Sequence, residues 1–264
     1  MAEINFVEEA KKIAASAQAA GITLRVLGAT AFRLHCPEHG DVHVAMERTL
    51  SDIDFAAYGK EEVKIEKFFE SGLHFQSERR QAALTPGLFV GRHIYEDPQT
   101  GLHVDIFLDQ LNMCHVVKFQ NRLHVDSPTI PLAELALEKL QIVRLNEKDV
   151  KDMLMLFAAH PVGDHDGETI NGKYIAGLMS KDWGFYYTTT LNLDKIRNGL
   201  PRYQRLFKPE DVNHIQERIT TLLGLIEQAP KSLKWKARAA IGAKMQWYND
   251  VEEVERADHL SDIG

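Results

Sequence analysis

The sequence predicts an α+β protein, in which a small mixed-sheet unit is followed by a helical C-terminal part. Short β-branched runs alternate with helical patterns as far as Asp126-Ser127-Pro128, and nearly every later segment has helical spacing. The chain has 264 residues, 44% of them hydrophobic, which is enough for a sizeable core. We therefore expect two domains, over residues 1–126 and 127–264.

The first unit is expected to start with a helix from Phe6 to Ala17, which Gly21 can close. A strand over Ile22–Leu27 and a helix over Ala29–Cys36 follow, and Pro37 stops the helix.

A polar loop is expected up to Ser51, followed by a strand over Asp52–Tyr58 and a helix over Lys60–Glu70. The runs Leu88–Tyr95 and Leu102–Leu108 flank turn residues and predict a hairpin.

The second domain is expected to be entirely helical. Pro131 suits the first turn of a helix, and apolar residues continue its inner face to Val143. Further helices are expected over 147–159, 171–180, 183–198 and 209–228, and from 232 onward.

Composition excludes several classes of protein. With only Cys36 and Cys114, the chain is not a disulfide-stapled scaffold, and a reduced cytoplasmic location is expected. No apolar run is long enough to cross a bilayer, and the N-terminus lacks the pattern of a signal peptide. The net charge of −7 argues against global attraction to nucleic acid or lipid. Residues 195–208 and 231–248 depart from this balance, because each stretch holds five basic residues and no acid.

A glycine turn is the first feature that could carry chemistry. In Leu27-Gly28-Ala29-Thr30-Ala31, a strand runs into a helix start, where free N–H groups and the helix dipole favour an anion such as phosphate. A plain strand–helix turn is the alternative.

The second feature is the pair Asp52 and Asp54. Alternate residues of a strand face the same side, so both carboxylates would lie together, opposite Ile53 and Phe55. A bound Mg²⁺ would relieve their repulsion. A solvated strand edge is the alternative.

The third feature is Asp105, a single carboxylate within the apolar run His103–Leu108. Val104 and Ile106 share one face of this strand and leave Asp105 on the other. A buried charge needs a partner, which a metal shared with Asp52 and Asp54 would supply. A solvent-facing position is the alternative.

In this order, the three features resemble the nucleotidyltransferase superfamily, which has the polymerase-β-like fold. The chain looks most like minimal bacterial nucleotidyltransferases related to AbiEii-type toxins, through the stretch Arg48–Asp54 and through Lys139, Arg144 and Lys148–Asp152. The resemblance covers roughly residues 21–157. Ala29 stands where the family usually has Gly or Ser.

The resemblance implies transfer of a nucleoside monophosphate from an NTP, with ATP the expected nucleotide, to a hydroxyl acceptor. It implies that Mg²⁺ is held by the three aspartates, with Asp105 accepting the hydroxyl proton. Nucleotide contacts are implied for five residues: Gly28, Ala29, Thr30, Ser51 and Lys139. For Lys139, a surface lysine is the alternative, and Lys148, Asp149 and Asp152 are expected to form a helix-surface charge set that packs the two domains together.

The acceptor stays open among RNA or tRNA, a small molecule and a protein hydroxyl, and an antitoxin-like protein is a further possible partner. The basic stretches also contain aromatic residues, a mixture that can hold RNA, although ordinary amphipathic helices have the same composition. Two alternative functions remain: a catalytically inactive binding or regulatory module with this fold, and a metal-dependent hydrolase using His160, Asp164, His165 and Asp166.

Overall fold

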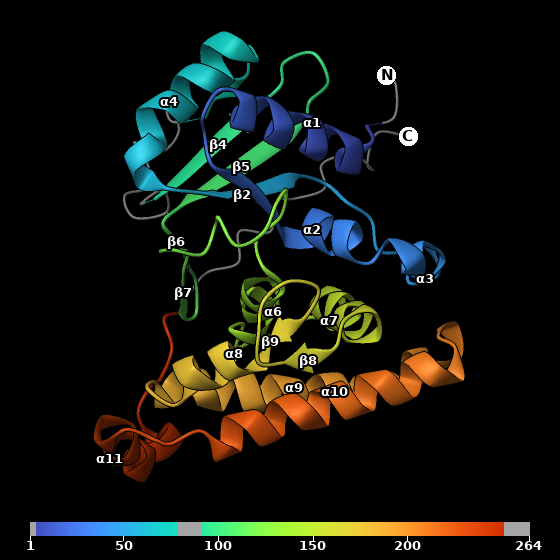
Figure 1. Cartoon of the computed structure of the whole chain (residues 1–264), viewed down its shortest axis with the longest axis vertical. Helices are drawn as coiled ribbons and strands as arrows, with labels where there is room; N and C mark the ends of the chain where they lie inside the picture. The colour runs from blue at the N-terminus through green and yellow to red at the C-terminus, as the bar shows by residue number, and fades with distance from the viewer. Residues whose placement is uncertain (1–3, 79–90, 251–264) are drawn as a thin grey trace, which may run out of the picture.

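The computed structural model describes residues 4–78 and 91–250 and shows a mixed α+β protein, as predicted (Figure 1). A five-stranded sheet has the strand order β1-β2-β5-β4-β3. Strand β2 runs parallel to β5, and the other neighbouring pairs are antiparallel. The strands are β1 Leu24–Leu27, β2 Ile53–Ala57, β3 Gln76–Ser77, β4 Arg92–Glu96 and β5 His103–Leu108.

One face of the sheet is apolar and covered by helix. Ile53 and Phe55 of β2 point to this side and are fully buried, as the alternating pattern predicts. The helix α4 (Glu62–Lys67) continues into a π-helical turn whose Phe69 stacks on Tyr95 of β4, with ring centroids 4.6 Å apart. Helix α1 (Phe6–Ala19) lies with α4 over the sheet in Figure 1.

The other face meets the helical part of the chain. Helix α2 (Gly28–His35) starts directly at the end of β1, and it contacts α6 (Leu132–Leu140) and α7 (Glu147–Ala159). A capping box of Asn146 and Asp149 starts α7 at the predicted residue. This junction is where the candidate site lies.

Four helices follow in the last third of the described chain, with the long α9 and α10 packed side by side (Figure 1). They are α8 Gly172–Met179, α9 Trp183–Tyr203, α10 Pro209–Gln228 and α11 Leu233–Ile241. The expectation of an entirely helical second domain is wrong in one detail. The strands β8 (Val162–Gly163) and β9 (Ile170–Asn171) form a short parallel ladder there, because the loop between them makes a full turn and returns the chain in the same direction.

Two further differences lie in the first half of the chain. The loop expected before Ser51 contains the helix α3 (Gly40–Ala45), which buries His43 and is followed by the buried Met46. A small hairpin of β6 (Gln110–Asn112) and β7 (Val116–Lys118) follows β5. The predicted hairpin is confirmed for β4 and β5, while residues 88–90 of its first run lie outside the described residues.

The residues after the expected domain boundary run along the edge of the sheet. The Val26 amide donates to the Pro128 carbonyl at 2.9 Å, and the Ile130 amide donates to the Val26 carbonyl at 3.0 Å. One continuous apolar core joins the sheet and the helices. The division at residues 126 and 127 therefore stays a prediction. Within the described ranges, no helix combines the length and apolar content that a membrane crossing requires.

Candidate active site at the β2–β5 strand pair

The central pair of the site is Asp54 and Asp105. They are direct partners in the parallel β2–β5 ladder, so their side chains leave the sheet on the same side. Ile53 and Val104, the preceding partners, point to the apolar side. Two residues that lie 51 positions apart in the sequence are thus neighbours in space, as the motif interpretation expected.

Asp105 is a buried carboxylate with a cationic partner. It is only 2% exposed, and the Arg92 guanidinium donates to its Oδ2 at 2.5 Å. The solvent-facing alternative is therefore wrong. Arg92 could not be predicted as this partner, because it lies opposite Phe107, two positions from Asp105, and reaches the acid only through the pairing of β4 with β5.

Asp54 lies in strongly negative surroundings. Burial, together with the nearby carboxylates of Asp52, Asp105 and Glu138, raises the pKa of Asp54 well above its ordinary value, and only Lys139 opposes this. A positive charge beside Asp54 would offset this repulsion. A hard divalent cation is the chemical partner that such a set of carboxylates suits.

Gly28 is required at the turn beside Asp54. Its φ of +70° favours glycine, and a Cβ at this position would lie 2.2 Å from Asp54 Oδ2. The prediction that the Gly28 amide is open to phosphate is not met, because this N–H donates to Glu138 Oε2 at 2.9 Å. Burial raises the pKa of Glu138, and Lys139 and the Gly28 amide partly offset this effect.

The small residues of the motif gather around Asp52. The hydroxyl of Ser51 donates to Asp52 Oδ1 at 3.2 Å, and that of Thr30 donates to the Asp52 carbonyl at 3.4 Å. Ala29 and Thr30 lie in the first turn of helix α2, which begins without a side-chain cap. Ala29 is partly exposed. Thr30 and Ser51 therefore help to position Asp52.

Lys139 is neither on the surface nor open to a ligand. Its Nζ lies 3.3 Å from Glu138, 3.2 Å from Asp149 and 3.5 Å from Asp152. Burial would lower the pKa of Lys139, but these three carboxylates outweigh it and raise the pKa. Arg48 completes the network with two hydrogen bonds to Asp152, at 2.8 and 3.0 Å.

The expected helix-surface charge set is therefore wrong for two of its members. Asp149 and Asp152 are buried, at 5% and 1% exposure, while Lys148 is exposed. The two carboxylates can lie in the interior because Lys139 and Arg48 compensate their charge. The pair of Arg48 and Asp152 does link the first half of the chain to α7, as the packing role predicted.

Three sets of potential metal ligands in the described part of the chain have donor atoms within 4.8 Å of one another. They are His35, His160 and Glu168; Glu62, Glu66 and His93; and Glu78, Glu96 and His103. The three aspartates do not form such a compact set. Nor do the residues of the hydrolase alternative, because Asp166 pairs with Arg122 at 2.7 Å, while Asp164 and His165 are exposed.

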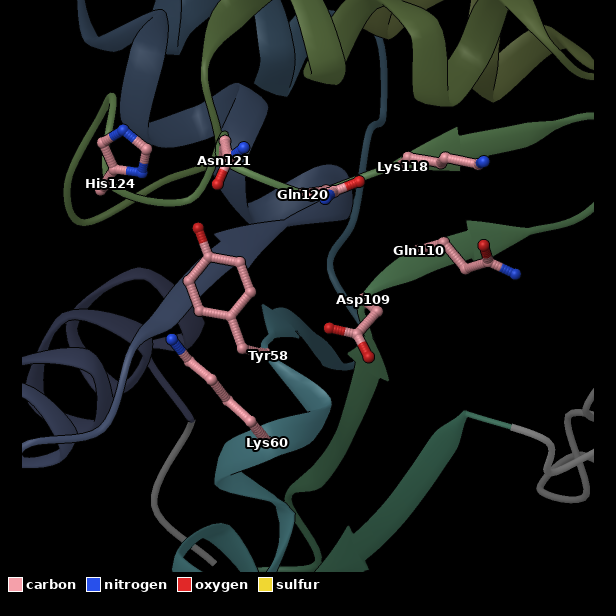
Figure 2. Close-up of a pocket in the computed structure, with 8 residues that line it drawn as sticks. All are labelled: Tyr58, Lys60, Asp109, Gln110, Lys118, Gln120, Asn121 and His124. Carbon is pink, nitrogen blue, oxygen red and sulfur yellow. The ribbon is translucent and has the colours of Figure 1, made fainter.

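A cavity of about 720 Å³ lies at the carboxyl ends of β2 and β5 (Figure 2). Asp109 lines this cavity and accepts a hydrogen bond from the Gly59 amide at 3.0 Å. Ligands often bind in a crevice at the carboxyl ends of parallel strands. The parallel pairing of β2 with β5 is therefore the feature from which this cavity could have been expected. The lining residues are Tyr58, Lys60, Asp109, Gln110, Lys118, Gln120, Asn121 and His124.

A second cavity, of about 580 Å³, lies between the β6–β7 hairpin, the start of α9 and α11. Within the described ranges, neither cavity is lined by a residue that the sequence placed in the catalytic site. Comparisons of the chain with models of protein families, with curated proteins and with solved structures each found no match.

Proposed function

We propose that this protein is a Mg²⁺-dependent nucleotidyltransferase that moves a nucleoside monophosphate from an NTP to a hydroxyl acceptor and releases pyrophosphate. One observation carries the proposal: Asp54 and Asp105 are partners on adjacent parallel strands, beside the glycine turn that starts α2. Asp52 adds a third carboxylate, whose charge acts on Asp54. This combination supports phosphoryl transfer, which depends mainly on positioning and charge neutralisation.

The donor set suits the cation. Asp52, Asp54 and Asp105 supply only oxygen ligands, which Mg²⁺ prefers, and a bound cation would draw together three carboxylates that do not form a compact set in this structure. When bound, Mg²⁺ would polarise the phosphate and stabilise the attacking and leaving oxygens.

The chain's own groups would divide the remaining tasks. Asp105, which Arg92 holds, would accept the proton of the acceptor hydroxyl. The amides of Ala29 and Thr30, in the uncapped first turn of α2, would bind the β- and γ-phosphates. Glu138 fixes the Gly28 turn, and Lys139 brings a positive charge close to Asp54.

The acceptor is proposed to be RNA, with tRNA as the first candidate. A small molecule or a protein hydroxyl remains a possible acceptor, and an antitoxin-like protein a possible regulator. The direct test is incubation with each labelled NTP and total cellular RNA, followed by identification of the labelled molecules.

Asp52→Asn and Asp54→Asn test the catalytic assignment. Each should lower incorporation by roughly 100-fold or more, the scale on which loss of one electrostatic stabiliser acts. Each should also remove the increase in melting temperature that Mg²⁺ and NTP give the wild-type protein.

Asp41→Asn provides the matched control, because Asp41 is exposed in the first turn of α3. It should leave both incorporation and ligand stabilisation unchanged. Near wild-type incorporation by both site variants would contradict the metal assignment.

A catalytically inactive binding or regulatory module is the second candidate. The Gly28 amide is taken by Glu138 and Lys139 is surrounded by carboxylates, so two expected nucleotide contacts are already engaged. Calorimetric titration with Mg²⁺ and each NTP, combined with the incorporation assay, separates the candidates, because the module would bind ligand without transferring nucleotide.

A further inference from the structure

A cavity rich in tryptophan and lysine lies away from the catalytic aspartates. We infer that this 580 Å³ cavity binds single-stranded RNA, and we call it the tryptophan cavity. It is formed by residues 114–118, 181–185 and 234–249, three segments that are far apart in the sequence. The inference deepens the proposed function, because it gives the RNA acceptor a binding site.

The charge of the cavity is opposite to that of the whole chain. Lys118, Lys181, Lys234 and Arg238 line it, and Asp182 is the one acid among its described lining residues. The Asp182 carboxylate caps α9 by accepting from the Phe185 amide at 3.0 Å. The cavity thus has a formal excess of three positive charges in a protein whose net charge is −7.

These cations are not neutralised by carboxylates of the described chain. Lys118, Lys181 and Lys234 are exposed, and no ion pair within 4.0 Å joins any of them to a described residue. Arg238 donates to backbone carbonyls, including that of Gly242 at 2.6 Å, and stacks 4.6 Å from the ring centre of Trp183. The cavity can therefore attract phosphate groups.

The aromatic lining supplies the second half of nucleic-acid recognition. All three tryptophans of the chain, Trp183, Trp235 and Trp247, line this cavity together with Tyr248. Tyr187 contacts both Trp183 and Trp247, with ring centres 5.0 and 5.1 Å apart. Because Trp183 is 7% exposed and already contacts Tyr187 and Arg238, the partly exposed Trp235, Trp247 and Tyr248 would supply the π-faces on which bases of any sequence can stack.

A membrane surface fits the same features less well. Helix α11 is basic and exposes Leu233, but it spans only nine residues. The indole N–H of Trp247 donates inward, to Thr188 Oγ1 at 3.0 Å, and Trp183 is only 7% exposed. These two rings are therefore not free to insert between lipids as an interfacial helix requires.

Lys118 extends the binding surface toward the sheet. It lines both the tryptophan cavity and the polar cavity of Figure 2, so the two cavities adjoin at this side chain. Lys60 and His124 line the polar cavity, in addition to Lys118. A single RNA strand bound in the tryptophan cavity can therefore continue along Lys118 toward the carboxyl ends of β2 and β5.

The test measures binding without catalysis. A fluorescent single-stranded RNA of about 12 nucleotides is titrated with the full chain in EDTA and without NTP, and anisotropy is recorded at several salt concentrations. Because every tryptophan lines the cavity, quenching of intrinsic fluorescence reports RNA at this site directly. We expect saturable binding, with quenching over the same concentration range.

Variants assign the contacts. Lys181→Gln combined with Lys234→Gln should weaken binding about 10-fold and reduce the salt slope by about 1.4, the value for two phosphate contacts on a single strand. Tyr248→Ala should weaken binding by roughly 5- to 100-fold through lost stacking. The control is Lys195→Gln with Lys208→Gln, which removes equal charge from two exposed positions outside the cavity and should leave binding nearly unchanged.

Three results would overturn the inference: absence of binding at low salt, equal losses in the control and cavity variants, or binding to phosphatidylserine vesicles without binding to RNA. The Asp54→Asn protein separates this inference from the proposed function. It should bind RNA normally even though it transfers no nucleotide. If the Lys181→Gln/Lys234→Gln variant transfers nucleotide to RNA and binds RNA as tightly as the wild type, the proposed function stands and RNA binding by the tryptophan cavity is rejected.

Discussion

At the scale of single residues, Gly28 has the most restricted position in the site. Its backbone has positive φ and lies against Asp54, so the turn depends on both the conformational freedom and the small size of glycine. These two requirements can be separated experimentally, because Gly101 has a similar φ of +74° and nothing within 4 Å of an added Cβ.

Gly28→Ala should therefore destabilise the protein more than Gly101→Ala does. Positive φ alone costs alanine about 1–2 kcal/mol. Only the Gly28 variant must also displace Asp54, so it should lose activity as well as stability. Urea unfolding and incorporation of labelled NTP measure the two effects. Equal destabilisation with full activity in both variants would contradict the close approach of Gly28 to Asp54.

Residue patterns in the sequence predicted which carboxylates lie together but not what surrounds them. Strand alternation, a local property, predicted which side of its own strand each aspartate occupies, while the resemblance and the shared-metal hypothesis led to the expectation that Asp105 lies beside Asp54. Arg92 and Glu138 were missed, since each reaches the site through long-range packing and neither belongs to a local motif.

At the scale of elements, the buried charge network joins α6, α7 and the segment before β2. Lys139 approaches three carboxylates, and Arg48 binds one of them from the other half of the chain. Such a network stabilises the junction only while its charges balance, because an unpaired buried charge is costly.

Lys139→Met should lower the free energy of unfolding by about 3–5 kcal/mol. Lys148→Met is the control, because Lys148 is exposed on α7, and it should change stability by less than about 0.5 kcal/mol. Adding Asp149→Asn to Lys139→Met should restore part of the loss, since one unpaired carboxylate is removed. Denaturant unfolding of these proteins and of Asp149→Asn alone measures this coupling. Equal stability of the Lys139 and Lys148 variants would show that the network is not buried.

Elements were predicted well where local signals agree. The predicted bounds of α7 and α10 are confirmed, because apolar spacing is joined by the Asn146 cap in α7 and by Pro209 at the start of α10. Helix α3 was missed because it is short, carries glycine and histidine, and buries only His43, so it shows no apolar spacing. The ladder of β8 and β9 could not be predicted, because strands of two residues are too short to show an alternating pattern.

At the scale of the whole molecule, buried histidines link stability to pH. Burial lowers the pKa of His35, His43 and His115 to about 4, from an ordinary value of 6.5. The unfolded chain binds these protons more tightly than the folded protein does. The contribution of these neutral histidines to the free energy of unfolding is therefore fully present above about pH 6.5 and is lost as the pH falls toward 4.

His43→Leu should reduce this acid sensitivity by on the order of 2–3 kcal/mol between neutral pH and pH 4. Leucine suits the position because His43 is 1% exposed and its Nε2 has no hydrogen-bond partner among the described residues. The control His165→Gln removes an exposed histidine and should leave the pH dependence unchanged. Urea unfolding at a series of pH values measures both. Parallel pH profiles of wild type and His43→Leu would show that His43 is not buried in its neutral form.

The segment that runs beside β1 also affects how separate molecules meet. Exposed strand edges can pair with one another and cause aggregation. Here Pro128 and Ile130 already occupy the hydrogen-bonding groups of Val26, and the opposite outer strand, β3, is only two residues long. Strand-to-strand self-association through β1 is thereby blocked, which favours molecules that remain dispersed at high concentration.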